Sequence, residues 1–280
     1  MTDVRTPCPQ LWDGNHKIEY IVDGDPEARV IEMQYPLIHG CNSRPWHFIH
    51  GFRMFLEVQL NRGIPQGPFQ GDITLQKEER EWMGQVEEIE GSGVRYWIIN
   101  AGGKFDFTAK WWEHARWQSV VDHFRGRILF VQVGENGHNH KPLNGVVDLR
   151  GKTDLRQLVR LVHHADGVAC GVTLLMHLAA AVEVKNGAKP LRPCVVVAGG
   201  REPAHWEAYP GHRFLDTVGR LDCCASGGCW KSRVVALNDD SELDKSLCQK
   251  PVESASGQTI PRCLDMIEPR HVIESIEGYL

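Results

Sequence analysis

Short apolar runs alternate with amphipathic helical patterns from Val94 to the end of the chain, and this alternation constrains the fold more than any other feature of the sequence. The runs expected to form strands are residues 94–100, 127–133, 145–149, 167–170 and 193–198. The patterns expected to form helices lie at residues 117–124, 153–162, 174–184 and 269–279. Because strands joined through helices usually pair in parallel, the alternation predicts an α/β fold of βαβ units around a parallel sheet.

The first 90 residues have a less regular pattern. Strands are expected at residues 2–6, 30–34 and 72–75, and helices at 47–60 and 78–90. Residues 90–93, Glu-Gly-Ser-Gly, separate this part from the rest, because two glycines and a serine loosen the backbone. We therefore predict one domain over residues 1–90 and a second over residues 94–280, which includes a cysteine-rich segment at residues 222–263.

The composition of the 280 residues fits a soluble globular protein with a small-molecule partner. Apolar residues make up 42% of the chain and charged residues 24%, which excludes a disordered or coiled-coil protein. The net charge of -5 predicts no binding to nucleic acid or to an anionic membrane. The longest apolar stretch, residues 167–184, falls short of the ~20 residues of a membrane span. Residues 1–10 lack the pattern of a secretory signal, so we expect a cytoplasmic location.

Two predicted turns follow strands and lead into helices, the position at which open α/β sheets bind ligands. The first contains Gly103, Lys104 and Lys110. Its glycine lets backbone N–H groups approach an anion, and either lysine could neutralise phosphate, although an ordinary strand-to-helix turn has the same composition. In the second, Thr173 is placed to cap a helix and His177 lies one turn further on the same face. Both could face a ligand, or His177 could be a core histidine.

A third turn follows the strand expected at residues 127–133 and carries Glu135, His138 and His140. Glu135 could accept hydrogen bonds from ribose hydroxyls. His138 and His140 could be metal ligands, or they could belong to a solvated polar loop. Because the carboxyl ends of parallel strands share one edge of a sheet, the three turns together predict one ligand site.

The order of these turns, and the sequence between them, resemble the carboxyl half of glycosyltransferase family 9, the ADP-heptose:lipopolysaccharide heptosyltransferases. Residues 151–158 (GKTDLRQL), 165–166 (AD) and 176–181 (MHLAAA) match the family pattern G-x-T-x-L-x-x-L, A-D and M-H-L-A-A-A. The resemblance covers residues 96–279. It implies a GT-B-like fold, in which two Rossmann-like domains face a cleft, with the first domain incomplete.

The resemblance also implies which residues bind an ADP-linked, heptose-like donor. The implied donor-binding residues are Gly103, Lys104, Lys110, Glu135, Thr173 and His177. Lys110 would contact the diphosphate, which Gly103 and Lys104 would help to cradle. Glu135 would bind the adenosine ribose. Thr173 and His177, at the helix start, would face the diphosphate and the sugar. The chain departs from the family at Val172, where an aspartate is usual.

Residues 1–90 would form a shortened acceptor-side domain that receives a hydroxyl group of a saccharide or a protein. The family's opening turn, which carries the acid that deprotonates the acceptor, has no counterpart in this sequence. No residue is selected as the general base, so the catalytic residues stay unknown.

The cysteines are distributed unevenly. Of nine, four are dispersed among apolar neighbours and five lie in the last quarter. Thiolates of Cys224, Cys229, Cys248 and Cys263, with Cys223 as the alternative first ligand, could hold zinc or iron tetrahedrally, although the spacing leaves a metal-free segment equally open. Resemblance to the heptosyltransferases that modify autotransporters implies iron there, in a structural role.

These observations predict a glycosyltransferase that moves a sugar from an ADP-linked donor to a hydroxyl acceptor and requires no catalytic metal. A metal-dependent hydrolase of a lactone or ester is one alternative, with Asp106, His138, His140 and His177 as candidate residues. A non-catalytic nucleotide-binding subunit is the other. A homo-oligomer is possible.

Overall fold

A six-stranded parallel sheet is the centre of the computed structural model, which describes residues 1–34, 38, 40–185 and 191–280. The strand order is β3-β2-β1-β4-β5-β6. The strands are β1 (Tyr96–Asn100), β2 (Leu129–Gln132), β3 (Val147–Asp148), β4 (Gly167–Gly171), β5 (Cys194–Gly199) and β6 (His212–Asp216). All residues of β1, β4 and β5 are buried, as expected for central parallel strands covered on both faces. The sheet confirms the predicted α/β class.

The direction of the strand order reverses between β1 and β4. From β1 the chain continues to β2 and β3 on one side, whereas β4 is followed by β5 and β6 on the other. Ile98 pairs with Val131 on one side and with Val168 on the other. In open α/β sheets such a reversal leaves a crevice at the carboxyl ends of the two strands, where ligands bind.

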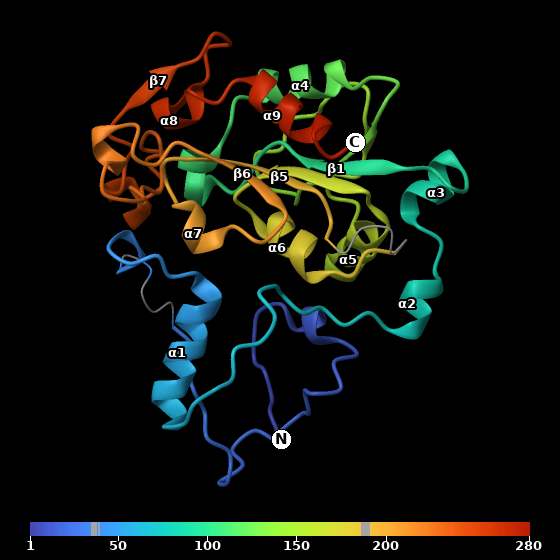
Figure 1. Cartoon of the computed structure of the whole chain (residues 1–280), viewed down its shortest axis with the longest axis vertical. Coiled ribbons are helices and arrows are strands. Elements are labelled where there is room, and N and C mark those ends of the chain that lie inside the picture. The colour runs from blue at the N-terminus through green and yellow to red at the C-terminus, as the bar shows by residue number, and fades with distance from the viewer. Residues whose placement is uncertain (35–37, 39, 186–190) are drawn as a thin grey trace.

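Helices cover both faces of the sheet (Figure 1). The long ones are α4 (His114–His123), α5 (Leu155–His164), α6 (Leu174–Ala181) and α9 (Pro269–Glu277), and the short ones are α7 (Ala204–Glu207) and α8 (Arg262–Asp265). On one face α5 and α6 pack on side chains such as Ile98, and on the other α4 and α9 pack on side chains such as Ile99. Successive strand residues thus feed two separate cores.

The amino-terminal part contains one long helix, α1, and several shorter helical elements. They are α1 (Phe48–Leu60), α2 (Lys77–Glu81), α3 (Gln85–Glu90) and the 3-10 turns η1 (Pro9–Trp12) and η2 (Gly40–Asn42). The helix expected at 47–60 is confirmed, whereas the one expected at 78–90 is broken into two. The strands expected at 2–6, 30–34 and 72–75 are wrong, because none of the described residues before Tyr96 forms a strand. Val30, for example, is 90% exposed, and a strand without a pairing partner buries too little to form.

Three further details differ from the sequence-based expectations. The edge strand β6 was not expected. Asp154, not Thr153, caps α5, because its carboxylate accepts a hydrogen bond from Gln157 N at 2.7 Å. The cysteine-rich segment contains a small antiparallel pair, β7 (Pro251–Glu253) and β8 (Thr259–Pro261), with the 3-10 turns η4 (Asp222–Cys224) and η5 (Glu242–Lys245).

None of the helices in the described ranges combines the length and the hydrophobicity needed to cross a bilayer.

Candidate functional site

The turns after β1 and β2 are joined to each other at the carboxyl edge of the sheet. Gly103 N donates to Asn139 O at 3.1 Å, and Asn139 N donates to Gly103 O at 3.1 Å. A Cβ atom at Gly102 would lie 1.8 Å from Asn139 O, so only glycine allows this approach. The amide of Gly103 is therefore engaged within the protein, whereas the side chain of Lys104 is exposed.

Gly102→Ala is expected to separate the two turns. The added methyl group cannot fit against Asn139 O, and overpacking of this kind typically lowers the free energy of unfolding by about 1–3 kcal/mol. Urea denaturation measures the change. Gly63→Ala is the matched control, because a Cβ atom there meets nothing within 4 Å. Equal stability of the two variants would contradict the close pairing.

Lys110 ends the 3-10 segment η3 (Phe105–Lys110), which follows β1. Its Nζ lies 2.8 Å from Oε1 of Glu202, a carboxylate that is 3% exposed. Arg201 donates to the same oxygen, and the Lys110 ammonium also lies 5.4 Å from the centre of the Phe107 ring. The lysine is thus held in place and partly neutralised by an internal carboxylate.

Thr173 and His177 lie at the start of α6, which follows β4. Thr173 has the extended backbone of an N-cap, with φ -142° and ψ 174°, but its hydroxyl caps nothing and, among the described residues, has no hydrogen-bond partner. His177 Nδ1 lies 2.9 Å from the Tyr209 hydroxyl, and the Phe48 ring of α1 packs edge-on against the imidazole. Burial, and then the charge of Lys110, lower the pKa of His177 to about 4, so the ring is neutral at pH 7.

Glu135 lies on an exposed part of the third turn, with 74% of its side chain accessible. Its carboxylate is 3.5 Å from His138 Nδ1. His140 packs against Gly134, and burial, followed by the charge of His138, lowers the pKa of His140 to about 4. Within the described ranges, no three His, Cys, Asp or Glu side chains are arranged to hold a metal. The structure therefore places His177 within reach of the charge of Lys110, while Glu135 lies on an exposed part of the third turn.

A fourth turn, after β5, was missed by the sequence reasoning. It supplies Arg201 and Glu202, and α7 follows with Glu207 as its last residue. Burial, and then the charge of Glu202, raise the pKa of Glu207 to about 7. The signal was present in the sequence, because Gly199-Gly200-Arg201-Glu202 leaves a predicted strand in the same way as the other turns.

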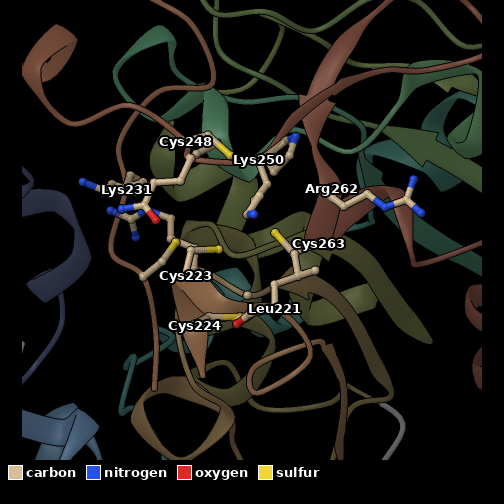
Figure 2. Close-up of a pocket in the computed structure, with 14 residues that line it drawn as sticks. Leu221, Cys223, Cys224, Lys231, Cys248, Lys250, Arg262 and Cys263 are labelled. Carbon is tan, nitrogen blue, oxygen red and sulfur yellow. Dashed lines mark hydrogen bonds between the residues drawn. The ribbon is translucent and has the colours of Figure 1, made fainter. Parts of the chain in front are cut away.

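The five cysteines of the last quarter line one cavity of about 20 Å³. They are Cys223, Cys224, Cys229, Cys248 and Cys263. In Figure 2 the sulfur atoms of Cys223 and Cys263 face the space between them. Since about 10–15 Å³ holds one water molecule, the cavity has room for a single ion-sized body.

The donor chemistry of this cavity fits a soft metal ion. Lys231, Lys250 and Arg262 also line it and would offset the negative charge of metal-bound thiolates. Burial raises the pKa of Cys263 to about 12, and the Cys224 thiol donates to Leu221 O at 3.4 Å. The five thiols thus line one cavity, although the described residues contain no three side chains arranged as a metal site.

The comparison with known families decides the identity of this chain. The family model of glycosyltransferase family 9 (heptosyltransferase) matches residues 46–186, which is half of the chain. The chain belongs to glycosyltransferase family 9. Three of the four turns, with Lys110, Glu135, Thr173 and His177, lie inside the matched region, whereas Glu202 and the five clustered cysteines lie beyond it. No curated protein matches the chain.

A solved structure of a family 9 protein shares the fold, and two further glycosyltransferase structures resemble the chain less closely. A family 9 glycosyltransferase from Veillonella parvula superimposes with a TM-score of 0.54 at 16% identity, over 84% of this chain and 60% of that one. ADP-heptose lipopolysaccharide heptosyltransferase II of E. coli superimposes with a TM-score of 0.48 at 17% identity, over 77% of this chain and 55% of that one. The iron-containing dodecameric glycosyltransferase TibC of enterotoxigenic E. coli superimposes with a TM-score of 0.46 at 20% identity, over 67% of this chain and 45% of that one. The chain thus spans about half the length of these proteins.

Proposed function

We propose that this chain is a glycosyltransferase that binds an ADP-linked, heptose-like sugar and transfers the sugar to a hydroxyl group of a saccharide or protein. The observation that carries the proposal is the convergence of two turns on one edge of the sheet, where the charge of Lys110 acts on His177 at the start of α6. The two turns follow β1 and β4, the strands at which the order of the sheet reverses. In this fold, that crevice is the expected place for a nucleotide.

The groups at this edge suit a diphosphate. Lys110 supplies a positive charge that offsets the charge developing on the leaving diphosphate. The Thr173 hydroxyl, without a partner among the described residues, can donate to a phosphate oxygen, and the neutral ring of His177 adds a hydrogen-bonding group without adding charge. Lys104, Gly103 and Glu135 would contribute from the joined turns, with Glu135 directed to the ribose.

The remaining parts of the proposal concern the rest of the chain. Residues 1–90 would form the acceptor side and residues 94–280 the nucleotide side, in a cytoplasmic enzyme that could form a homo-oligomer. Four of the five clustered cysteines would hold a structural iron or zinc ion. Such an ion would cross-link the segment around η4 to α8 and would take no part in the transfer step.

Replacing Lys110 tests the proposal. Lys110→Ala is expected to weaken ADP binding by about 1–3 kcal/mol, the usual cost of removing a charged hydrogen-bond partner. Glu202 keeps Arg201 as a partner in this variant, so the fold should persist. Isothermal titration calorimetry with ADP measures the loss, and Lys77→Ala, with 80% of its side chain exposed, is the control.

Two results of that titration would count against the proposal. The first is the absence of ADP binding by the wild-type chain. The second is an unchanged affinity in Lys110→Ala, which would place the nucleotide elsewhere. ADP binding without any turnover of ADP-heptose would favour the non-catalytic nucleotide-binding subunit instead.

A further inference from the structure

Four charged side chains meet beside the proposed diphosphate site. Lys110 comes from η3, Arg201 and Glu202 from the turn after β5, and Glu207 from the end of α7. Lys110 and Arg201 both donate to Oε1 of Glu202, and the charges of all three act on Glu207. Two cations and two carboxyl groups therefore share one small region, which we call the Glu207 cluster.

Glu207 is the member of the cluster that is least satisfied. Its Oε2 atom is shielded from solvent and has no hydrogen-bond partner in the part of the chain that the structure describes. Its raised pKa of about 7 reflects burial and the neighbouring Glu202, opposed by Lys110 and Arg201. A carboxyl group with a pKa near the working pH is well suited to take up and release a proton.

The amino-terminal part covers Glu207 from the opposite side. The His47 ring lies against the backbone of Glu207 and Ala208, and His205 Nε2 lies 2.8 Å from Cys41 O. In Figure 1, α7 lies between α1 and the edge of the sheet. Glu207 is thus at the junction between the proposed acceptor side and the proposed nucleotide side.

His47 and His177 are poorer proton acceptors than Glu207. Burial is the main cause that lowers the pKa of both His47 and His177 to about 4. Protonating either ring at neutral pH would therefore cost free energy. Glu202 Oε2 also lacks a hydrogen-bond partner in the described residues, but Glu202 shares its Oε1 with two cations. Among the described residues no ion pair involves Glu207, which makes it the carboxylate better placed to accept a proton.

We propose that Glu207 accepts the proton of the acceptor hydroxyl during sugar transfer, an inference that rests on the proposed function. The acceptor oxygen forms a bond to the anomeric carbon. The bond from that carbon to the diphosphate breaks, and its electron pair leaves with the nucleotide. The hydroxyl proton moves to the carboxylate of Glu207, while Lys110, held by Glu202, faces the leaving diphosphate.

The test compares ADP binding with turnover, using ADP-heptose as donor and water as acceptor, so that the natural acceptor is not needed. Glu207→Gln is expected to bind ADP within about twofold of the wild type and to release ADP from ADP-heptose at least about 100-fold more slowly, since a general base contributes roughly 10²–10⁴-fold. The rise of the wild-type rate through about pH 7 should disappear. Glu78→Gln, an exposed glutamate of α2, is the matched control.

A stability measurement separates this role from a structural one. The pKa of Glu207 is raised from its ordinary value of 4.5, so its ionised form destabilises the fold as the pH rises through about 7. Glu207→Gln should therefore unfold at a higher temperature than the wild type at pH 8.

The outcomes are distinguishable. Turnover by Glu207→Gln at the wild-type rate and with the wild-type pH profile would overturn the role of Glu207, as would ADP binding by a wild type that never releases ADP from ADP-heptose. A wild type that does not bind ADP would overturn the proposed function itself.

Discussion

Cys263→Ser is expected to release a bound metal ion and to lower the free energy of unfolding by at least about 3 kcal/mol. Binding of a structural zinc ion by four ligands is worth roughly 10–16 kcal/mol at pH 7, and the loss of one thiolate forfeits part of this. Cys263 is the second residue of α8, and its sulfur would lie 3.3 Å from a Cβ atom at Gly199, at the end of β5. The proposed metal would therefore tie the cysteine-rich segment to the sheet.

Loss of the metal should also weaken ADP binding at the nucleotide site. Arg201 Nε donates to Lys231 O of the cysteine-rich segment at 2.6 Å, and Cys229 N donates to Gly200 O at 3.1 Å. Both contacts support the turn that carries Glu202, the partner of Lys110. A looser segment should therefore weaken ADP binding as well as stability.

Metal analysis of the purified chain, combined with urea denaturation, measures these effects. Cys8→Ser is the control, because Cys8 is exposed and far from the cluster in sequence. Chelation should become easier as the pH falls, since the ligands must be deprotonated thiolates. A wild type without iron or zinc, or a Cys263→Ser variant as stable as Cys8→Ser, would contradict the structural metal.

Arg192→Met is expected to lower the free energy of unfolding by about 3–5 kcal/mol. The Arg192 side chain is 2% exposed and its guanidinium donates hydrogen bonds to the backbone carbonyls of His163, Ala165, Ala179, Val182 and Glu183. Methionine retains much of the apolar bulk but removes this donor. His163 O still accepts from Lys185 N, and Glu183 O still lies 2.9 Å from His163 Nδ1, so the cost of about 1–3 kcal/mol for each unsatisfied group applies to at most three carbonyls. Because the arginine binds the ends of α5 and α6, it also fixes the helix that begins after Thr173.

Arg95→Met is the matched control for this prediction. The Arg95 side chain is 81% exposed and pairs with Asp166 at the surface, where an ion pair is worth about 0–1 kcal/mol. Urea denaturation of both variants gives the comparison. A loss in Arg192→Met no larger than the loss in Arg95→Met would show that the carbonyls find other partners.

Hydrophobic patterning predicted the later part of the fold well because its central strands are buried on both faces. All five strands expected after Val94 are present. The missed strand, β6, contains His212, Arg213 and Asp216 and lies at the sheet edge, where polar residues are tolerated and the apolar signal is weak. In the amino-terminal part the apolar runs predicted strands that do not form, because a run of sequence cannot show whether a pairing strand lies beside it.

The site was predictable only as far as topology determines it. Turns after parallel strands share an edge, and this rule selected Lys110, Thr173 and His177. The pairing of Lys110 with Glu202 joins residues far apart in the chain and depends on how the turn after β5 packs. Likewise, the engagement of the Gly103 amide by Asn139 is a contact between loops, which no local pattern encodes.

A crystal structure of the chain with ADP tests the central claim most directly. We predict density for the diphosphate at the carboxyl edge between β1 and β4, with a phosphate oxygen within hydrogen-bond distance of Lys110 Nζ and a second near the Thr173 hydroxyl. ADP bound at another surface, with the Lys110–Glu202 pair undisturbed and no phosphate beside it, would contradict the proposed donor site.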